Sequence, residues 1–134
     1  TELQDASVCR EEWKDSADVV LCDVPCSGLG IIRKKPEIRF KNPDEIRTLP
    51  EIQARILANC AQYVKKGGTL VYSTCTILQR ENEDVVRAFL TENMEFEAVS
   101  WTHPVCGERA DGMVTLLPPV HNTDGFFIAK MYRK

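Results

Sequence analysis

The sequence predicts an α/β fold, in which parallel strands of one sheet are joined by helical crossovers. Short apolar stretches alternate along the chain with longer segments of helical periodicity, and two of the short stretches run directly into polar motifs. Strand–helix–strand units of this kind connect in the right-handed sense. The chain has 134 residues, of which 43% are hydrophobic, so we expect a single unit over residues 1–134.

The two central strands are predicted from their apolar content. Residues 18–24 include an unbroken apolar run from Val19 to Cys22, which suits a strand with both faces covered, and Pro25 ends it. Residues 69–74 are rich in side chains that favour strands and directly follow a glycine pair, so we expect the neighbouring strand there.

Helices are predicted between and after these strands. Asn42, Pro43 and Glu45 suit the N-cap, N1 and N3 positions of a helix start. Pro50 is expected to restart a helix, and the apolar side chains after it repeat at helical spacing until the glycine pair stops them. A second, amphipathic helix is predicted over residues 80–93, with its acidic face toward solvent.

The end of the chain is predicted to add two more strands. Residues 96–101 and 125–132 are rich in strand-forming side chains, whereas residues 102–124 are expected to be mostly loop. This order of elements completes the α/β pattern.

Composition and cysteine use exclude several classes of protein. No apolar run approaches the roughly 20 residues that a membrane-spanning helix needs, so we expect no membrane contact. The first residues lack both the basic and the apolar part of a secretory signal, which predicts a cytoplasmic protein. The six cysteines are expected to be reduced, and without a CxxC pair or suitably spaced histidines no metal site is expected.

Charged side chains are unevenly distributed, although the net charge is only −3. We expect the acidic cluster to be a solvated face, and residues 33–41 of the basic cluster to meet phosphates of a nucleic acid, with a solvated loop as the alternative. The acidic cluster consists of Glu81, Glu83, Asp84, Glu92, Glu95 and Glu97, and the basic cluster of Arg33, Lys34, Lys35, Arg39, Lys41 and Arg47.

Polar motifs follow both central strands. They are Asp-Val-Pro-Cys-Ser-Gly at residues 23–28 and Ser-Thr-Cys-Thr at residues 73–76. Ligands of open α/β sheets bind outside the carboxyl ends of the strands, so Cys26 and Cys75 are expected to face one pocket with Asp23 beside them. A thiol in such a place is a candidate nucleophile.

Three motifs in order give the chain a family resemblance. They are the two strand-end motifs, the second extended to Tyr72, and Asp-Gly-Phe-Phe-Ile-Ala-Lys at residues 124–130. With these motifs the chain resembles the Sun/RsmB-type ribosomal RNA cytosine-5 methyltransferases over nearly its whole length. The resemblance implies the C-terminal portion of a Rossmann-like methyltransferase domain that depends on S-adenosylmethionine, with a mostly parallel sheet and an antiparallel final strand.

The resemblance also implies a reaction and its residues. Carbon 5 of a cytosine in ribosomal RNA, with 16S rRNA as the expected substrate, would receive the methyl group through a covalent cysteine–cytosine intermediate. Cys75 would attack the base and Cys26 would assist release, whereas DNA cytosine methyltransferases use the Pro-Cys cysteine as nucleophile. Asp23 is expected to contact the base, where charge develops, or the cofactor.

For the cofactor, the resemblance implies Asp5, Asp23 and Pro25 as binding residues. Asp5 matches the acidic residue that follows the third strand of such domains and helps hold the adenosine. The glycine-rich cofactor loop and the ribose-binding acid of the family have no counterpart in the sequence. We therefore expect one partial domain of a longer enzyme, inactive alone and able to self-associate through a cut sheet edge.

Two alternative interpretations compete with this one. An amino-group methyltransferase of the same fold would carry two prolines and an aromatic residue after the first strand, and Cys26 stands where the second proline would be. A non-catalytic RNA-binding or protein-binding fragment is the alternative from another class, and the missing cofactor loop keeps it open.

Overall fold

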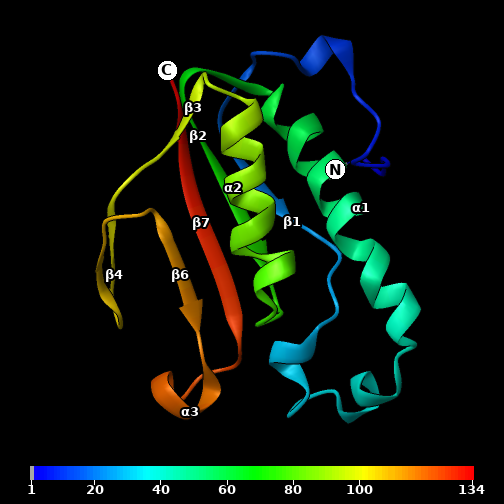
Figure 1. Cartoon of the computed structure of the whole chain (residues 1–134). Coiled ribbons are helices and arrows are strands. Elements are labelled where there is room, and N and C mark those ends of the chain that lie inside the picture. The colour runs from blue at the N-terminus through cyan, green and yellow to red at the C-terminus, as the bar shows by residue number, and fades with distance from the viewer. Residues whose placement is uncertain (1) are drawn as a thin grey trace.

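The computed structural model of the chain describes residues 2–134 (Figure 1). The helices are α1 (Pro43–Ala61), α2 (Glu83–Glu92) and α3 (Pro118–His121), with short 3-10 helices η1 (Glu11–Trp13), η2 (Leu29–Ile31), η3 (Pro36–Phe40) and η4 (Gln79–Glu81). A five-stranded sheet contains β1 (Ala17–Asp23), β2 (Val64–Thr74), β3 (Phe96–Ala98), β6 (Met113–Leu116) and β7 (Phe126–Arg133). A separate hairpin joins β4 (Trp101–His103) to β5 (Gly107–Arg109).

The sheet has the order β1-β2-β7-β3, and β6 also pairs with β7. β1 and β2 are parallel, and β7 is antiparallel to β2. Because β3 and β6 are each antiparallel to β7, they run in the same direction as β1 and β2. The predicted α/β class, with most strands in one direction and an antiparallel final strand, is confirmed.

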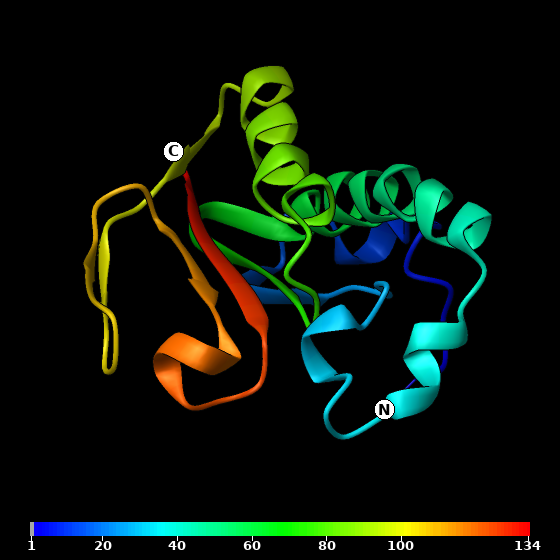
Figure 2. The same cartoon turned by 60° about the horizontal axis from the view of Figure 1, so that its bottom comes forward.

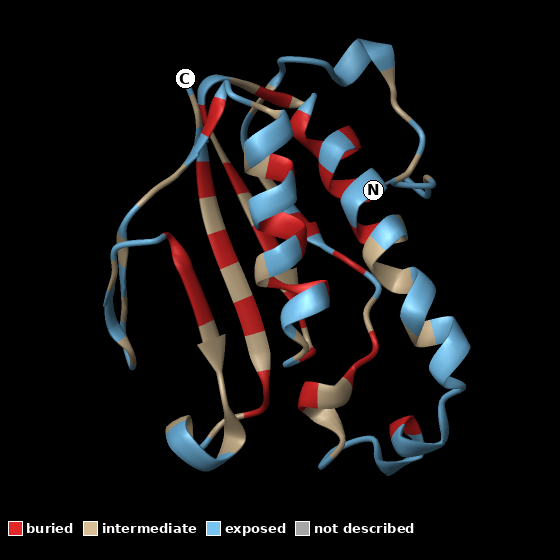
Figure 3. Cartoon of the chain, viewed as in Figure 1, coloured by how far each residue is buried: buried red, intermediate tan, exposed pale blue. Residues whose placement is uncertain are grey.

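Both long helices cover the same face of the sheet (Figures 1 and 2). Side chains of β2 and β7 alternate between the interior and the opposite face, an alternation that Figure 3 shows along β7. The fully buried core includes Leu57 of α1, Val86 of α2, Tyr72 of β2 and Phe127 of β7. No helix in the described part of the chain is both long and apolar enough to cross a membrane.

The helix after the first strand differs from the prediction. Pro50 does not restart a helix but lies inside α1, a single helix of 19 residues that begins after Asn42, whose side chain accepts a hydrogen bond from the amide of Asp44. Pro50 only removes one intrahelical hydrogen bond, and the apolar face that follows still packs on the sheet. The glycine pair belongs to β2, where Gly67 takes a φ of 80° at an irregularity in the pairing with β1.

The predicted strand over residues 96–101 is wrong in its extent, and so is the predicted loop over residues 102–124. The strand is divided into β3 and β4, and the expected loop contains β5, β6 and α3. These strands have three or four residues each, which is too few to produce a recognisable alternation of polar and apolar side chains.

The face of the sheet opposite α1 and α2 exposes apolar side chains near one edge. β1 pairs only with β2 among the described strands, and its Val19 and Leu21 are 63% and 67% exposed. An unpaired strand edge beside exposed apolar groups is a template for association.

We expect the chain alone to self-associate through this edge, so that its apparent mass in light scattering rises with concentration. Leu21→Lys should suppress the rise, because it places a charge on the exposed face. Val105→Lys is the matched control: Val105 is 66% exposed, close to the 67% of Leu21, but lies outside the sheet. A monomer at every concentration would contradict the prediction.

Candidate active site

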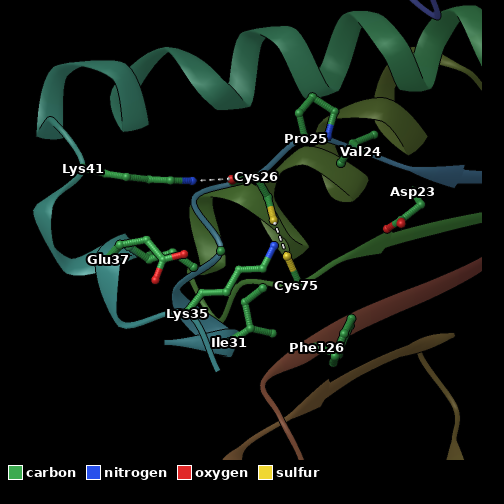
Figure 4. Close-up of a pocket in the computed structure, with 12 residues that line it drawn as sticks. Asp23, Val24, Pro25, Cys26, Ile31, Lys35, Glu37, Lys41, Cys75 and Phe126 are labelled. Atoms are coloured by element: carbon green, nitrogen blue, oxygen red, sulfur yellow. Dashed lines mark hydrogen bonds between the residues drawn. The ribbon is translucent and has the colours of Figure 1, made fainter. Parts of the chain in front are cut away.

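A cavity of about 610 Å³ opens where β1 and β2 end (Figure 4). Because the two strands are parallel, with Asp23 opposite Ser73, the segments that follow them leave the sheet at one edge. The cavity is lined by residues 23–26, which begin at the last residue of β1, and by Cys75 directly after β2. Parts of the η2–η3 segment and Phe126, the first residue of β7, complete the lining. The structure therefore brings Asp23, Pro25, Cys26 and Cys75 together.

The two cysteines of the cavity are in direct contact. Their Sγ atoms lie 3.2 Å apart, and both side chains are half-buried. Burial raises the pKa of Cys26 to about 12, with the hydrogen bond to Cys75 as the next largest cause. Two negative charges at this separation would repel each other strongly, so the pair favours states with at most one thiolate.

Asp23 is the last residue of β1 and is exposed at the cavity. Its Oδ1 accepts a hydrogen bond of 2.9 Å from the hydroxyl of Ser73, its register partner on β2. This contact fixes the carboxylate at the strand ends, within the same cavity as both sulfurs.

Asp5 lies apart from the other predicted site residues. Its Oδ1 accepts hydrogen bonds from the hydroxyl and the amide of Ser7, at 2.7 and 2.9 Å, which lower the pKa of Asp5. The segment around it is attached to α1 by a hydrogen bond from the Asn59 side chain to the carbonyl of Ala6. Asp5 does not line the cavity, so the structure does not bring it together with Asp23 and Pro25.

The predicted basic cluster has two different environments. Lys35 and Lys41 line the cavity, and Lys41 Nζ donates to the backbone carbonyl of Ser27 at 2.9 Å. Arg33 and Lys34 instead lie 3.5 and 2.5 Å from the carboxylate of Asp124, at the start of the third sequence motif. The hydrogen bond from Lys34 is the main cause of the lowered pKa of Asp124.

Gly30, two residues after the first sequence motif, contacts the second and the third motif. Its amide donates to the carbonyl of Cys75 at 3.0 Å, and its carbonyl accepts from the amide of Gly125 at 2.8 Å. A Cβ atom on Gly30 would lie 2.1 Å from the carbonyl oxygen of Gly125, so only glycine fits this crossing. The crossing locks the loop after β2 against the segments before α1 and before β7.

Three buried polar residues next to the cavity segments are not predicted from the sequence: Gln53, Glu81 and Asn82. Glu81 was predicted on a solvated acidic face, and that prediction is wrong because Glu81 is 0% exposed. It ends η4 before α2 begins, and its carboxylate accepts a hydrogen bond from the amide of Ser27. No local signal in the sequence indicates this burial, because the partners of Glu81, Ser27 and Gln53, are far from it in the chain.

Metal ligands are not grouped in residues 2–134: these residues contain no cluster of three or more His, Cys, Asp or Glu side chains suited to hold an ion.

Comparison with known proteins places the fold and the site in context. The sequence model of the family 16S rRNA methyltransferase RsmB/F matches residues 3–132. The probable ribosomal RNA small subunit methyltransferase B of Bacillus subtilis (strain 168) is 43% identical over 140 residues, which is 99% of this chain and 31% of the relative.

Two solved structures share the fold. The crystal structure of PH0851 matches with a TM-score of 0.88 at 36% identity, covering 97% of this chain and 30% of that protein. A methyltransferase homolog protein from Pyrococcus horikoshii matches with a TM-score of 0.69 at 31% identity, covering 87% of this chain and 39% of that protein. The chain spans about 30% of the length of the B. subtilis relative and of PH0851. It belongs to the 16S rRNA methyltransferase RsmB/F family.

Proposed function

We propose that the chain supplies the catalytic thiols of an enzyme that methylates carbon 5 of a cytosine in ribosomal RNA, with 16S rRNA as the substrate. The observation that carries this proposal is the contact of two thiols, 3.2 Å apart, in one cavity with an aspartate. Membership of a family of 16S rRNA methyltransferases supports the class of reaction.

In the proposed reaction the Cys75 thiolate adds to carbon 6 of the cytosine. This addition makes carbon 5 electron-rich enough to take a methyl group. Water then takes the carbon 5 proton, and the electrons of that C–H bond restore the ring double bond as the C6–S bond breaks and frees the thiolate. We propose that Asp23, which lines the same cavity, hydrogen-bonds the base while charge develops on it or contacts the cofactor. The methylated cytosine leaves, and both cysteines return to their starting state.

The assignment of attack to Cys75 and of assistance to Cys26 follows the family resemblance of the motifs at residues 72–76 and 23–28. A thiolate, not a thiol, is the nucleophile, and the pKa of Cys26 is raised to about 12. Cys26 therefore keeps its proton at neutral pH, which is consistent with a role other than attack. Its sulfur lies against that of Cys75, so it can approach the same base.

We propose that the RNA backbone contacts Lys35 and Lys41, which supply positive charge at the rim of the cavity. The target base must leave its stack, or already be single-stranded, to reach the sulfurs. Arg33 and Lys34 instead pair with Asp124, so we assign them to holding their loop against the segment before β7.

S-adenosylmethionine is the proposed methyl donor, and when bound it supplies the electrophilic methyl group. The exposed Asp23 carboxylate and the Pro25 ring offer a polar and an apolar contact in the cavity, which fits part of such a molecule. Asp5 lies outside the cavity, so its proposed contact requires the adenosine to extend past the present lining toward the N-terminal segment.

The roles of the two thiols can be separated in a chimera, in which this chain replaces the matching region of the B. subtilis relative. Cys75→Ala should abolish methyl transfer and trap no RNA. Cys26→Ala should let the covalent bond form but slow its release, so that a protein–RNA adduct accumulates on denaturing electrophoresis with labelled RNA. An adduct in Cys75→Ala and none in Cys26→Ala would exchange the two roles.

The raised pKa of Cys26 can be tested in the chain alone by alkylation with iodoacetamide. Because the thiolate fraction rises tenfold per pH unit until the pH approaches the pKa, the rate at Cys26 should rise by about tenfold between pH 9 and pH 10, where the rate at an exposed cysteine in an unstructured control peptide, with a pKa of about 8.5, has nearly levelled off. In Cys75→Ala the alkylation rate at Cys26 should level off at a lower pH than in the unsubstituted chain, but at a higher pH than in the control, because burial is the larger cause of the raised pKa. A plateau at Cys26 that coincides with the control would contradict this account.

We expect the chain alone to bind S-adenosylmethionine far more weakly than the full-length B. subtilis relative does. Only two of its three predicted cofactor residues, Asp23 and Pro25, line the cavity. Calorimetric titration of both proteins measures the difference, and equal affinity would show that this cavity suffices for the cofactor.

A further inference from the structure

Two buried side chains hold the backbone on both sides of Cys26. Gln53 donates from Nε2 to the carbonyl of Pro25 at 3.0 Å, and Glu81 Oε2 accepts from the amide of Ser27 at 2.8 Å. Gln53 also donates to Glu81 Oε2 at 3.0 Å, which joins the two contacts. Both side chains are 0% exposed.

The residue after Glu81 holds the segment around the other thiol in the same way. Asn82 Oδ1 accepts from the hydroxyl of Thr74 at 2.6 Å, and its Nδ2 donates to the carbonyl of Thr76 at 3.1 Å. These contacts lie immediately before and immediately after Cys75. The hydroxyls of Ser27 and Thr76, 2.7 Å apart, connect the two segments directly.

Stability alone does not account for a carboxylate in this position. Removing a carboxylate from water is costly, and a well-packed apolar side chain often serves the core as well or better. Glu81 Oε2 accepts from an amide group and a backbone N–H rather than from a cation, and the other oxygen, Oε1, is buried with no hydrogen-bond partner among the described residues. Its acceptor capacity is what distinguishes it from an apolar residue here, and that capacity is directed at the loop of Cys26.

We propose that Glu81 and Asn82 are positioning residues that set the places of the two thiols separately: Glu81, with Gln53, fixes the Cys26 loop, and Asn82 fixes the Cys75 loop. Because the two residues are adjacent, one short segment, from the end of η4 to the start of α2, sets the positions of both sulfurs. This inference rests on the proposed function for its catalytic meaning, since it assigns a purpose to the thiol geometry.

The test measures iodoacetamide alkylation of each thiol in the chain itself. Cys26 is followed in a Cys75→Ala background and Cys75 in a Cys26→Ala background, so that their mutual contact does not mix the two rates. Glu81→Met keeps the length of the side chain but removes the oxygen that accepts from both Ser27 N–H and Gln53. Asn82→Asp keeps the acceptor for Thr74 but places a carboxylate oxygen against the Thr76 carbonyl.

We expect a crossed result. Glu81→Met should raise the alkylation rate of Cys26 by about tenfold or more, since tenfold matches the loss of one hydrogen bond to a charged group, and leave Cys75 within about twofold. Asn82→Asp should change the alkylation rate of Cys75 and leave that of Cys26 within about twofold. If Asn82→Asp does not fold, Thr74→Val removes the hydroxyl that donates to Asn82, together with the longer contact of 3.4 Å that this hydroxyl accepts from the Thr76 amide, and tests the same loop.

Asn59→Ala is the matched control for general loss of stability. Asn59 is a buried amide on α1, 5% exposed, that bonds to the carbonyl of Ala6 outside the cavity. It should lower the melting temperature without altering either rate. Unchanged rates in the Glu81 and Asn82 variants would overturn the proposal, and so would parallel changes at both thiols that simply follow the melting temperature. Alkylation involves no methyl transfer, so failure of the proposed function would appear in the chimera and not here.

Discussion

The parallel pairing of β1 with β2 is the constraint on which the site depends. With Asp23 opposite Ser73, the two strands end at the same level, and Cys26 and Cys75 follow only a few residues later. A register shift of one residue would turn alternate side chains to the other face and separate the two segments. The 3.2 Å contact between the sulfurs is therefore a consequence of strand register as much as of the loops themselves.

A network of buried polar side chains supplies the loops of the two sulfurs with hydrogen bonds that an apolar core cannot supply. Loops have backbone donors and acceptors that need partners when they are buried, and here Gln53, Glu81 and Asn82 supply them. In front of the network, the crossing at Gly30 joins the loop after β2 to the start of β7. The thiols thus lie on irregular backbone that is held from both sides, as a reactive pair requires if its geometry is to be fixed before substrate binds.

The strand ends and the thiol pocket could be predicted from sequence because both are local patterns: an apolar run followed by a polar motif. The burial of Glu81 could not be predicted in this way, because its partners Ser27 and Gln53 are 54 and 28 residues distant in the chain. Pro50 was misread since a proline that suits a helix start can also remain within a helix that is already capped at Asn42. The contact of Asp5 with a cofactor stays a prediction, because the structure places it outside the cavity.

Cys75, and not Cys26, is proposed to form the bond to the cytosine. The most direct measurement uses the chimera with RNA that carries 5-fluorocytosine at the target position, because fluorine at carbon 5 blocks the elimination that would free the enzyme. Trypsin should place Cys75 in peptide 67–80 and Cys26 in peptide 15–33, which mass spectrometry distinguishes. The account predicts the nucleotide on peptide 67–80, and its presence on peptide 15–33 would contradict the account.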